Sequence, residues 1–174
     1  MSKKHFEALP PLKQSINEVN ALKVFAKSSQ LDIRSGFNFI NPYQFLVGGE
    51  VDGCILDDNS IAAIIEVKTF QALYKTSVEE FLQSIDKVGF YHHDLMKVGD
   101  EWALRPSSKY YSQIQCNLMT LNLSFTVLLI YSPFDMSIYP IYILRNEEYI
   151  YNLFIKLETM MNYYVINHLK SLTY

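Results

Sequence analysis

The stretch from Gly48 to Thr69 constrains the fold more than any other part of the sequence. It has the pattern of two strands, near 45–56 and 61–68, joined by the polar turn Asp57-Asp58-Asn59-Ser60. The second strand is apolar until it ends in Glu66-Val67-Lys68. Because side chains alternate along a strand, the two charged residues share one face and the valine lies on the other. The sequence therefore predicts a β-hairpin that carries charged groups at the edge of a buried sheet.

The charges at this end of the hairpin indicate a metal-dependent nuclease centre. The hairpin brings Asp52 to the same end as Glu66, and such an arrangement is costly unless a cation compensates it. Mg²⁺ binds hard oxygen ligands, which the two carboxylates and the Val67 carbonyl can supply. Lys68 can orient or deprotonate a water, or stabilise the charge that develops in phosphodiester hydrolysis. The alternative interpretation of the same residues is an edge hairpin with solvated charges.

The rest of the chain alternates helical and extended patterns, which predicts one domain of the α/β (α+β) class with a mixed central sheet flanked by helices. Residues 1–11 are expected to form a flexible leader to this single domain of 174 residues. The expected elements are a helix over 12–29, extended segments over 31–46 with turns at Arg34-Ser35-Gly36 and Asn41-Pro42, a helix over 77–98, a polar connection over 99–107, a helix over 109–122 capped by Ser107 or Ser108, strands over 125–131 and 139–144, and a helix over 147–170.

Composition excludes several classes of protein. An apolar content of 49% with 19% charged residues fits a folded globular chain. No apolar run approaches the roughly 18 residues of a membrane span, and no secretory signal is evident, so we expect an intracellular protein without membrane contact. Cys54 and Cys116 are too few for a disulfide framework or a four-cysteine metal site, and both are expected to be buried thiols. The net charge of −3 leaves DNA binding open, because an acidic metal centre contributes to it.

Three motifs in order resemble those of a known family. They are Gly49-Glu50-Val51-Asp52-Gly53, then Ile65-Glu66-Val67-Lys68, then Tyr110-Tyr111-Ser112-Gln113-Ile114-Gln115. Together they resemble the phage lambda exonuclease and YqaJ-type viral recombinase nucleases of the PD-(D/E)xK superfamily, over about residues 12–165. The resemblance implies a restriction-endonuclease-like core and a Mg²⁺-dependent deoxyribonuclease in which Mn²⁺ can substitute. It also implies action on double-stranded DNA ends, in viral or mobile-element recombination or repair.

The resemblance assigns roles to individual residues. Asp52 and Glu66 would be metal-binding carboxylates, the Val67 carbonyl a further ligand, and Lys68 the catalytic lysine. Gln113 would face the scissile phosphate or the attacking water. Glu18 falls where the family has a glutamate that contributes to a second metal position, although its position beside the apolar stripe of the first helix is also typical of an exposed helix acid.

The resemblance has consequences for partners and also departs from the family pattern. It implies a homo-oligomer, a single-strand annealing protein as a partner, and a location in the cytoplasm or nucleus, of a host cell if the protein is viral. However, the family's upstream 5′-phosphate-binding segment has no counterpart in this sequence, and Glu50 replaces a small hydroxylic residue. These departures concern 5′-phosphate recognition and leave the metal centre intact. The alternative functions are an endonuclease of the same superfamily and a catalytically inactive DNA-binding or assembly protein.

Further residues were weighed for binding. Lys109, Tyr110 and Tyr111, with Arg105, form the candidate DNA-contact patch, because cations attract phosphates and rings stack on bases. One of the two tyrosines is expected to pack inward instead. The pair His92-His93 is expected on a helix surface rather than at a metal site. The last helix is expected to face the core or a subunit interface with one stripe of side chains, namely Ile150, Leu153, Phe154, Leu157, Met161 and Tyr164.

Overall fold

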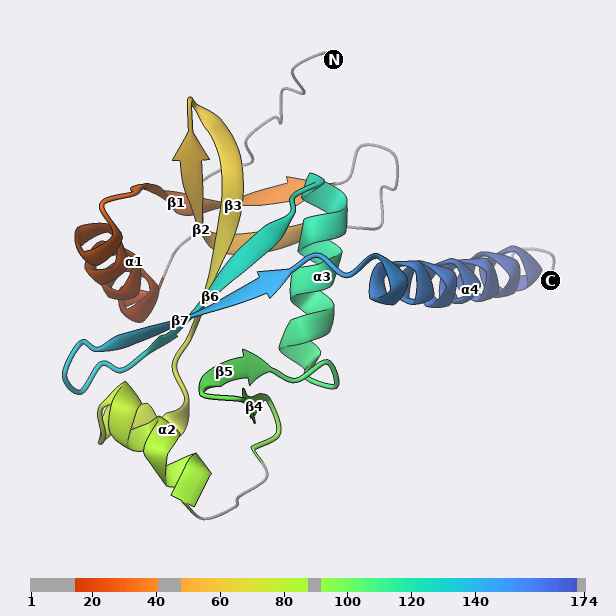
Figure 1. The fold of residues 1–174 in the computed structure, drawn as a ribbon. Coiled ribbons are helices and arrows are strands. Elements are labelled where there is room, and N and C mark those ends of the chain that lie inside the picture. The colour runs from red at the N-terminus through yellow and green to blue at the C-terminus, as the bar shows by residue number, and fades with distance from the viewer. Residues whose placement is uncertain (1–14, 41–47, 88–91, 172–174) are drawn as a thin grey trace.

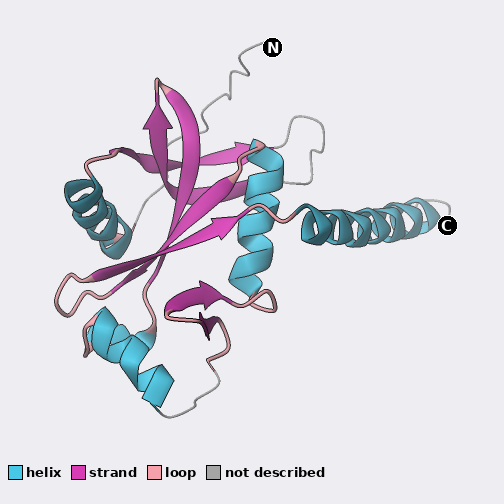
Figure 2. Cartoon of the chain, in the orientation of Figure 1, coloured by secondary structure: helices cyan, strands magenta, loops and turns pink. Residues whose placement is uncertain are grey.

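A computed structural model describes residues 15–40, 48–87 and 92–171, which form a five-stranded sheet, a separate two-stranded sheet and the helices around them (Figures 1 and 2). The elements are α1 Ile16–Ser29, β1 Asp32–Ile40, β2 Gly48–Asp57, β3 Ser60–Lys68, the short 3₁₀ helix η1 Gln71–Tyr74, α2 Val78–Lys87, β4 Leu95–Val98, β5 Glu101–Leu104, α3 Lys109–Leu121, β6 Phe125–Tyr131, β7 Ile138–Leu144 and α4 Glu147–Ser171.

The large sheet has the strand order β1-β2-β3-β6-β7, in which β3 and β6 are parallel and the other neighbours are antiparallel. A parallel pair needs a long crossover, and the segment that carries α2, β4, β5 and α3 supplies it. α1 packs on one face, against a cluster that includes Ile65 and Val67. α3 packs on the other face, where Ile114 and Leu118 meet Leu128 and Ile130. The predicted mixed sheet with flanking helices is confirmed.

The predicted hairpin of β2 and β3 is also confirmed. Asp58 and Asn59 occupy its turn with φ values of 46° and 61°. Positive φ at both central residues is the signature of a two-residue hairpin turn whose twist matches that of the strands, and Asn and Asp tolerate it best after glycine. The turn therefore fixes the register of the strands that carry Asp52 and Glu66.

The turn expected at Arg34-Ser35-Gly36 is wrong, because β1 runs through it without interruption. Gly36 is needed there for close approach rather than for turning: a Cβ at this position would lie 1.7 Å from the Val51 carbonyl oxygen. The glycine thus lets β1 pass tightly over the part of β2 that precedes Asp52. The turn predicted at Asn41-Pro42 and the leader over 1–11 lie outside the described residues.

The prediction of a helix over 77–98 is wrong for its second half. α2 ends at Lys87, and Leu95–Val98 is a strand that pairs with Glu101–Leu104, in the segment expected to be a polar connection. Leu95 is buried, as the helical pattern required, but a strand can bury the same leucine. A single apolar position does not distinguish the 3.6-residue period of a helix from the two-residue period of a strand. Pairing with β5 decided that this segment is a strand.

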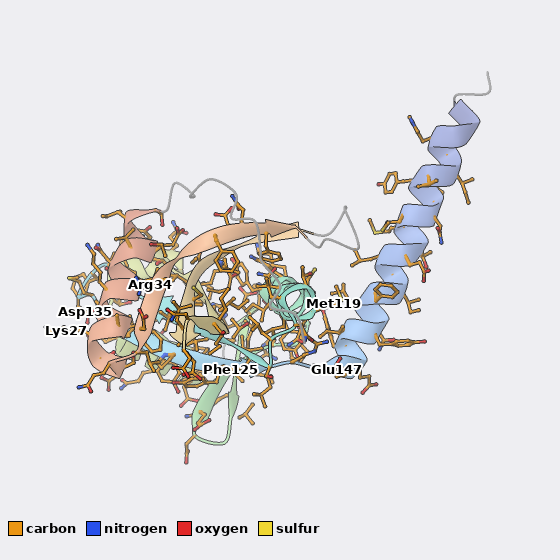
Figure 3. The ribbon with its side chains drawn as sticks, turned by 90° about the horizontal axis from the view of Figure 1, so that it is seen from above. Lys27, Arg34, Met119, Phe125, Asp135 and Glu147 are labelled. Atoms are coloured by element: carbon orange, nitrogen blue, oxygen red, sulfur yellow. The ribbon has the colours of Figure 1, made fainter. Side chains whose placement is uncertain are left out.

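The last helix, α4, runs away from the body of the molecule (Figures 1 and 3). Ile150 is buried as predicted, but the inward orientation expected for Tyr164 is wrong, since this side chain is 66% exposed. No helix in the described part of the chain is both long enough and apolar enough to cross a bilayer. Of the two cysteines, both free thiols, Cys54 is buried as expected and Cys116 is half-buried.

Candidate metal and catalytic centre

The ends of β2 and β3 bring together the three charged residues that the sequence singled out. Gly53 pairs with Ile65, and the same register one residue further places Asp52 opposite Glu66. Asp52 does not continue the ladder with its backbone; instead its Oδ2 accepts a hydrogen bond of 2.7 Å from the Val67 N–H. Lys68 Nζ lies 3.5 Å from Glu66 Oε2. The predicted cluster of two carboxyls and one ammonium therefore exists in the fold.

The Val67 carbonyl lies on the same edge of β3 as its N–H, because both groups of a strand residue point to the same side. That N–H meets Asp52, and the regular pairing between β2 and β3 ends at Gly53 and Ile65. The carbonyl is therefore directed toward Asp52 beyond the end of the ladder. This position agrees with the role that the resemblance implies for it.

Glu66 is the buried acid of the cluster, with only 2% of its side chain exposed. Burial raises its pKa to about 8, the negative charge of Asp52 adds to the increase, and Lys68 and Asn117 oppose it. The pKa of Asp52 is also raised, first by burial and then by Glu18 and Glu50, while the Val67 N–H and Lys68 lower it. Each carboxyl is thus more easily protonated than a free acid, because the site concentrates negative charge away from water.

This charge balance fits a divalent cation. Two carboxylates and one backbone carbonyl are hard oxygen donors of the kind that Mg²⁺ binds, with waters completing its coordination. No group of three or more His, Cys, Asp and Glu side chains within the described residues could hold a metal ion by itself. A metal ion here would need Asp52 and Glu66 together with the Val67 carbonyl and waters.

Glu18 stands at the edge of this cluster but has a local structural task. Its Oε2 accepts a hydrogen bond from the Ser15 N–H, and Ser15 Oγ accepts one from the Glu18 N–H, which forms a capping box at the start of α1. Its charge still reaches Asp52, whose pKa it raises. The structure brings Glu18 near the site, with its carboxylate engaged in the cap.

One face of α3 covers the other side of the cluster. Ser108 caps this helix, as predicted. Tyr110, Gln113 and Asn117 are spaced by three and four residues, so they share a face. The Tyr110 ring centroid lies 5.1 Å from Lys68 Nζ, and Asn117 Nδ2 donates to Glu66 Oε1 at 3.2 Å. Gln113 lies between these two contacts and is exposed, as a substrate-facing residue would be.

Asn117 is the site residue that sequence reasoning missed. It is 3% exposed, and besides Glu66 its amide reaches the Glu50 carbonyl oxygen at 3.5 Å. Its position seven residues after Tyr110 was a signal in the sequence, since it repeats the same helix face. By contrast, Gln115 is fully buried and ties α3 to the start of α4, donating to the Leu144 carbonyl and accepting from the Asn146 N–H.

The predicted DNA-contact patch is divided by the fold. Lys109 is exposed and its ammonium lies 5.1 Å from the Tyr110 ring centroid. Tyr111 instead packs edge-on against Tyr149, with 4.9 Å between ring centroids, so one of the two tyrosines is inward as expected. Arg105 Nε donates to the carbonyls of His92 and Leu95 and thereby holds a loop together. Lys109 and Tyr110 are the members of the patch that stay beside the site.

His92 does not lie on a helix surface, which corrects the expectation. Its Nδ1 accepts from the N–H groups of Asp94 and Leu95, and its ring packs against Phe70 and Phe81. Its pKa is lowered by burial, so the neutral ring that accepts these bonds is favoured. His92 is therefore a loop-forming residue.

The fold so described is similar to that of a solved exonuclease. It is shared by LHK-Exo in complex with dAMP, which is 16% identical with a TM-score of 0.54, over 88% of this chain and 70% of that one. A second structure, the alkaline exonuclease LHK-Exo from Laribacter hongkongensis, gives 16% identity and a TM-score of 0.52, over 88% of this chain and 71% of that one. No family model and no curated protein matches the sequence. The fold expected from the three motifs is confirmed.

Proposed function

We propose that this protein is a metal-dependent deoxyribonuclease that hydrolyses phosphodiester bonds, acting as an exonuclease on double-stranded DNA ends. The observation that carries the proposal is the nearly unexposed Glu66 carboxyl opposite Asp52 and beside Lys68, on the fold of an alkaline exonuclease. A buried acid beside a half-buried one destabilises a fold, and the presence of this pair is explained if it binds a cation. The dAMP bound by LHK-Exo supports a nucleotide product for that protein's site.

The residues of the cluster have separable tasks in this reaction. Asp52, Glu66 and the Val67 carbonyl would hold Mg²⁺, which supplies Lewis-acid stabilisation of phosphate charge and a more acidic bound water. Lys68 orients the attacking water or stabilises the negative charge that develops on the phosphate. Its ammonium is held between Glu66 and the Tyr110 ring, so that it has few other positions available. Gln113, exposed on the same face of α3, contacts the phosphate or the water.

The protein's partners and context follow as part of the proposal. Lys109 is exposed beside Tyr110 and would attract the DNA backbone toward the site. A role in viral or mobile-element recombination or repair, with a single-strand annealing protein as partner, accords with an enzyme that resects DNA ends.

The test compares an end-labelled linear duplex with a supercoiled plasmid, each with Mg²⁺ and with EDTA. We expect the linear duplex to be consumed in Mg²⁺ or Mn²⁺ and the closed circle to be spared. Lys68→Ala should reduce this cleavage by about 100-fold or more, while Lys27→Ala, an exposed lysine at the far end of α1, should leave it unchanged.

Two other outcomes of this experiment would each support one of the alternative functions. Cleavage of the circle would identify an endonuclease on the same fold. Absence of metal-dependent cleavage on every DNA or RNA would overturn the enzyme and leave a DNA-binding or assembly protein, which a gel-shift with the same duplex would detect.

A further inference from the structure

Two adjoining cavities form a groove outside the candidate metal centre. The larger, of about 730 Å³, lies between β7 and the β4–β5 hairpin beside it (Figure 1). The smaller, of about 490 Å³, lies between α2, the same hairpin and the start of β7. Trp102 and Tyr139 line both cavities, which together we call the Trp102 groove. None of the described residues to which the proposed function gives a role lines either cavity.

The groove runs along two strand edges that have no partner strand in the described part of the chain. β7 is the last strand of the large sheet and pairs with β6, while β5 pairs with β4. Pro140 within β7 agrees with this, because proline has no N–H to donate and occurs on edge strands. All of β5 and residues 139–144 of β7 line the larger cavity. An extended peptide in this cavity can therefore pair with the backbone of a free edge.

Apolar side chains form much of the groove, and three of them are open to solvent. Val98 is 56% exposed, Tyr142 63% and Leu144 71%, and all three line the larger cavity. Trp102 and Tyr139 are half-buried and pack against the core cluster, so they form the floor. Exposed apolar patches of this kind mark interaction surfaces. The groove therefore favours an occupant with apolar side chains.

Ion pairs within the groove neutralise only part of its charge. Five acids and two bases of the described chain line the two cavities. Both bases are bound to acids of the groove itself: Lys97 Nζ lies 2.5 Å from Asp86 Oδ2, and Arg145 Nε lies 2.7 Å from Glu147 Oε1. These two pairs leave three acids uncompensated.

The three remaining acids are Glu79, Asp100 and Glu101, and all of them are exposed. None forms an ion pair with another described residue. Asp100 and Glu101 are adjacent at the tip of the β4–β5 hairpin. Negative charge at the rim attracts lysine and arginine side chains and repels phosphates. The groove therefore favours a basic protein segment and disfavours a nucleic acid.

We propose that the Trp102 groove is the docking site of an extended segment of a partner protein that is rich in both basic and apolar residues. The backbone of the segment pairs with the free edge of β7. Its apolar side chains contact Trp102 and Tyr142, and its basic side chains meet Glu79, Asp100 and Glu101. Backbone pairing supplies affinity, whereas the three acids and the apolar floor select the sequence.

The fluorescence of Trp102 tests the proposal directly, because it is the one tryptophan of the sequence. The full-length protein is panned against a phage-displayed library of random, tryptophan-free dodecapeptides, and the most enriched peptides are synthesised. We expect these peptides to contain basic and apolar residues and to shift the Trp102 emission to shorter wavelength, with dissociation constants of about 1–100 μM. Enrichment of acidic peptides, or of none, overturns the proposal. So does a peptide that binds without changing the emission.

Charge reversal in the full-length protein locates the bound peptide. The double variant D100K/E101K should raise the dissociation constant about tenfold or more, because two attractive contacts become repulsive. The matched control D57K/E158K changes the net charge equally at exposed positions outside the groove and should stay within about twofold of the wild type. Tyr142→Ser should weaken binding about fivefold, because it removes exposed apolar surface. Circular dichroism checks that every variant is folded. If D100K/E101K binds the peptide as well as the control does, the proposal is overturned.

A short DNA duplex in EDTA is the comparison ligand. We expect it to leave the Trp102 emission unchanged, because the rim acids repel phosphates. A duplex that shifts the emission and displaces the peptide would identify the groove as a nucleic-acid site and overturn the proposal. Docking of the peptide does not depend on DNA cleavage, so the proposed function and this inference can fail separately.

Discussion

Burial of the Glu66 carboxyl makes the stability of the fold depend on whether this side chain is protonated. Its carboxyl is almost fully removed from water, and the negative charge of Asp52 acts on it from across the hairpin. In the absence of metal, the pKa of about 8 means that Glu66 keeps its proton at neutral pH. Binding of a cation at the proposed site would require loss of that proton, so metal binding and proton release would be coupled at this residue.

The raised pKa predicts a pH dependence of stability in EDTA. Below pH 4.5, the ordinary value, Glu66 is protonated in both the folded and the unfolded chain. Between pH 4.5 and about 8 only the folded chain retains the proton, so the unfolding free energy falls as pH rises and then levels off. Glu66→Gln removes this loss. We expect its thermal midpoint to exceed that of the wild type by several degrees near pH 8 and by much less near pH 5.

The measurement is a series of thermal melts from pH 5 to pH 9 without metal. Glu101→Gln, an exposed acid on β5, is the control and should follow the wild type throughout. A difference between Glu66→Gln and the wild type that is the same at every pH would contradict the assignment.

At the scale of elements, α3 connects the two halves of the Glu-x-Lys motif. Its N-terminal turn places Tyr110 against Lys68, and two turns later Asn117 donates to Glu66. The helix is itself fixed by Gln115, which bonds to the end of β7 and the start of α4. The geometry of the site therefore depends on the docking of α3 as much as on the hairpin that carries the charges.

Asn117→Leu tests this dependence, since leucine has the same number and branching of side-chain heavy atoms as asparagine but cannot donate. We expect kcat to fall about tenfold or more with little change in KM for DNA, because Asn117 touches the acid rather than the substrate. Unfolding stability should fall by about 1–3 kcal/mol, the usual cost of a lost buried hydrogen bond. Steady-state kinetics and urea denaturation provide the two readings.

Gln113→Ala is the comparison within the same helix face. Because Gln113 is exposed and is the proposed contact to the phosphate or the water, its removal should affect catalysis with little change in stability. If Asn117→Leu retains wild-type kcat, the hydrogen bond to Glu66 has no part in positioning it.

For the whole molecule, the proposed metal centre should govern stability as well as the proposed activity. A ligand that binds only the folded state stabilises it by about 2.7 kcal/mol at a concentration of 100 times Kd. For a chain of this length that corresponds to a rise of roughly 5–10 °C in the thermal midpoint. We expect Mg²⁺ or Mn²⁺ to produce such a rise over EDTA, and Asp52→Asn to abolish it.

Differential scanning fluorimetry with increasing Mg²⁺ measures this effect without reference to cleavage. Asp32→Asn, an acid that pairs with Arg34 at the surface of β1, is the control and should keep the full rise. An equal rise in Asp52→Asn would place the metal elsewhere.

Local physical rules were enough to predict much of this protein. The hairpin of β2 and β3 follows from its turn residues and apolar strands, and α3 follows from its serine cap. Asp52 and Glu66 are only 14 positions apart, so the hairpin alone brings them together. The core of the candidate site was therefore predictable, because its members belong to one local unit.

Tertiary structure decided the features that depend on contacts between segments distant in the sequence. Gly36 is a point of close approach because β1 crosses β2, and Leu95 is in a strand because β5 pairs with it. Asn117 reaches Glu66 across 51 positions of sequence, a contact set by the packing of α3 on the sheet. α4 has the apolar stripe of a buried helix, yet the fold supplies no partner for most of its length within the described residues. Helical periodicity specifies which side chains share a face, whereas the arrangement of the other elements decides what that face meets.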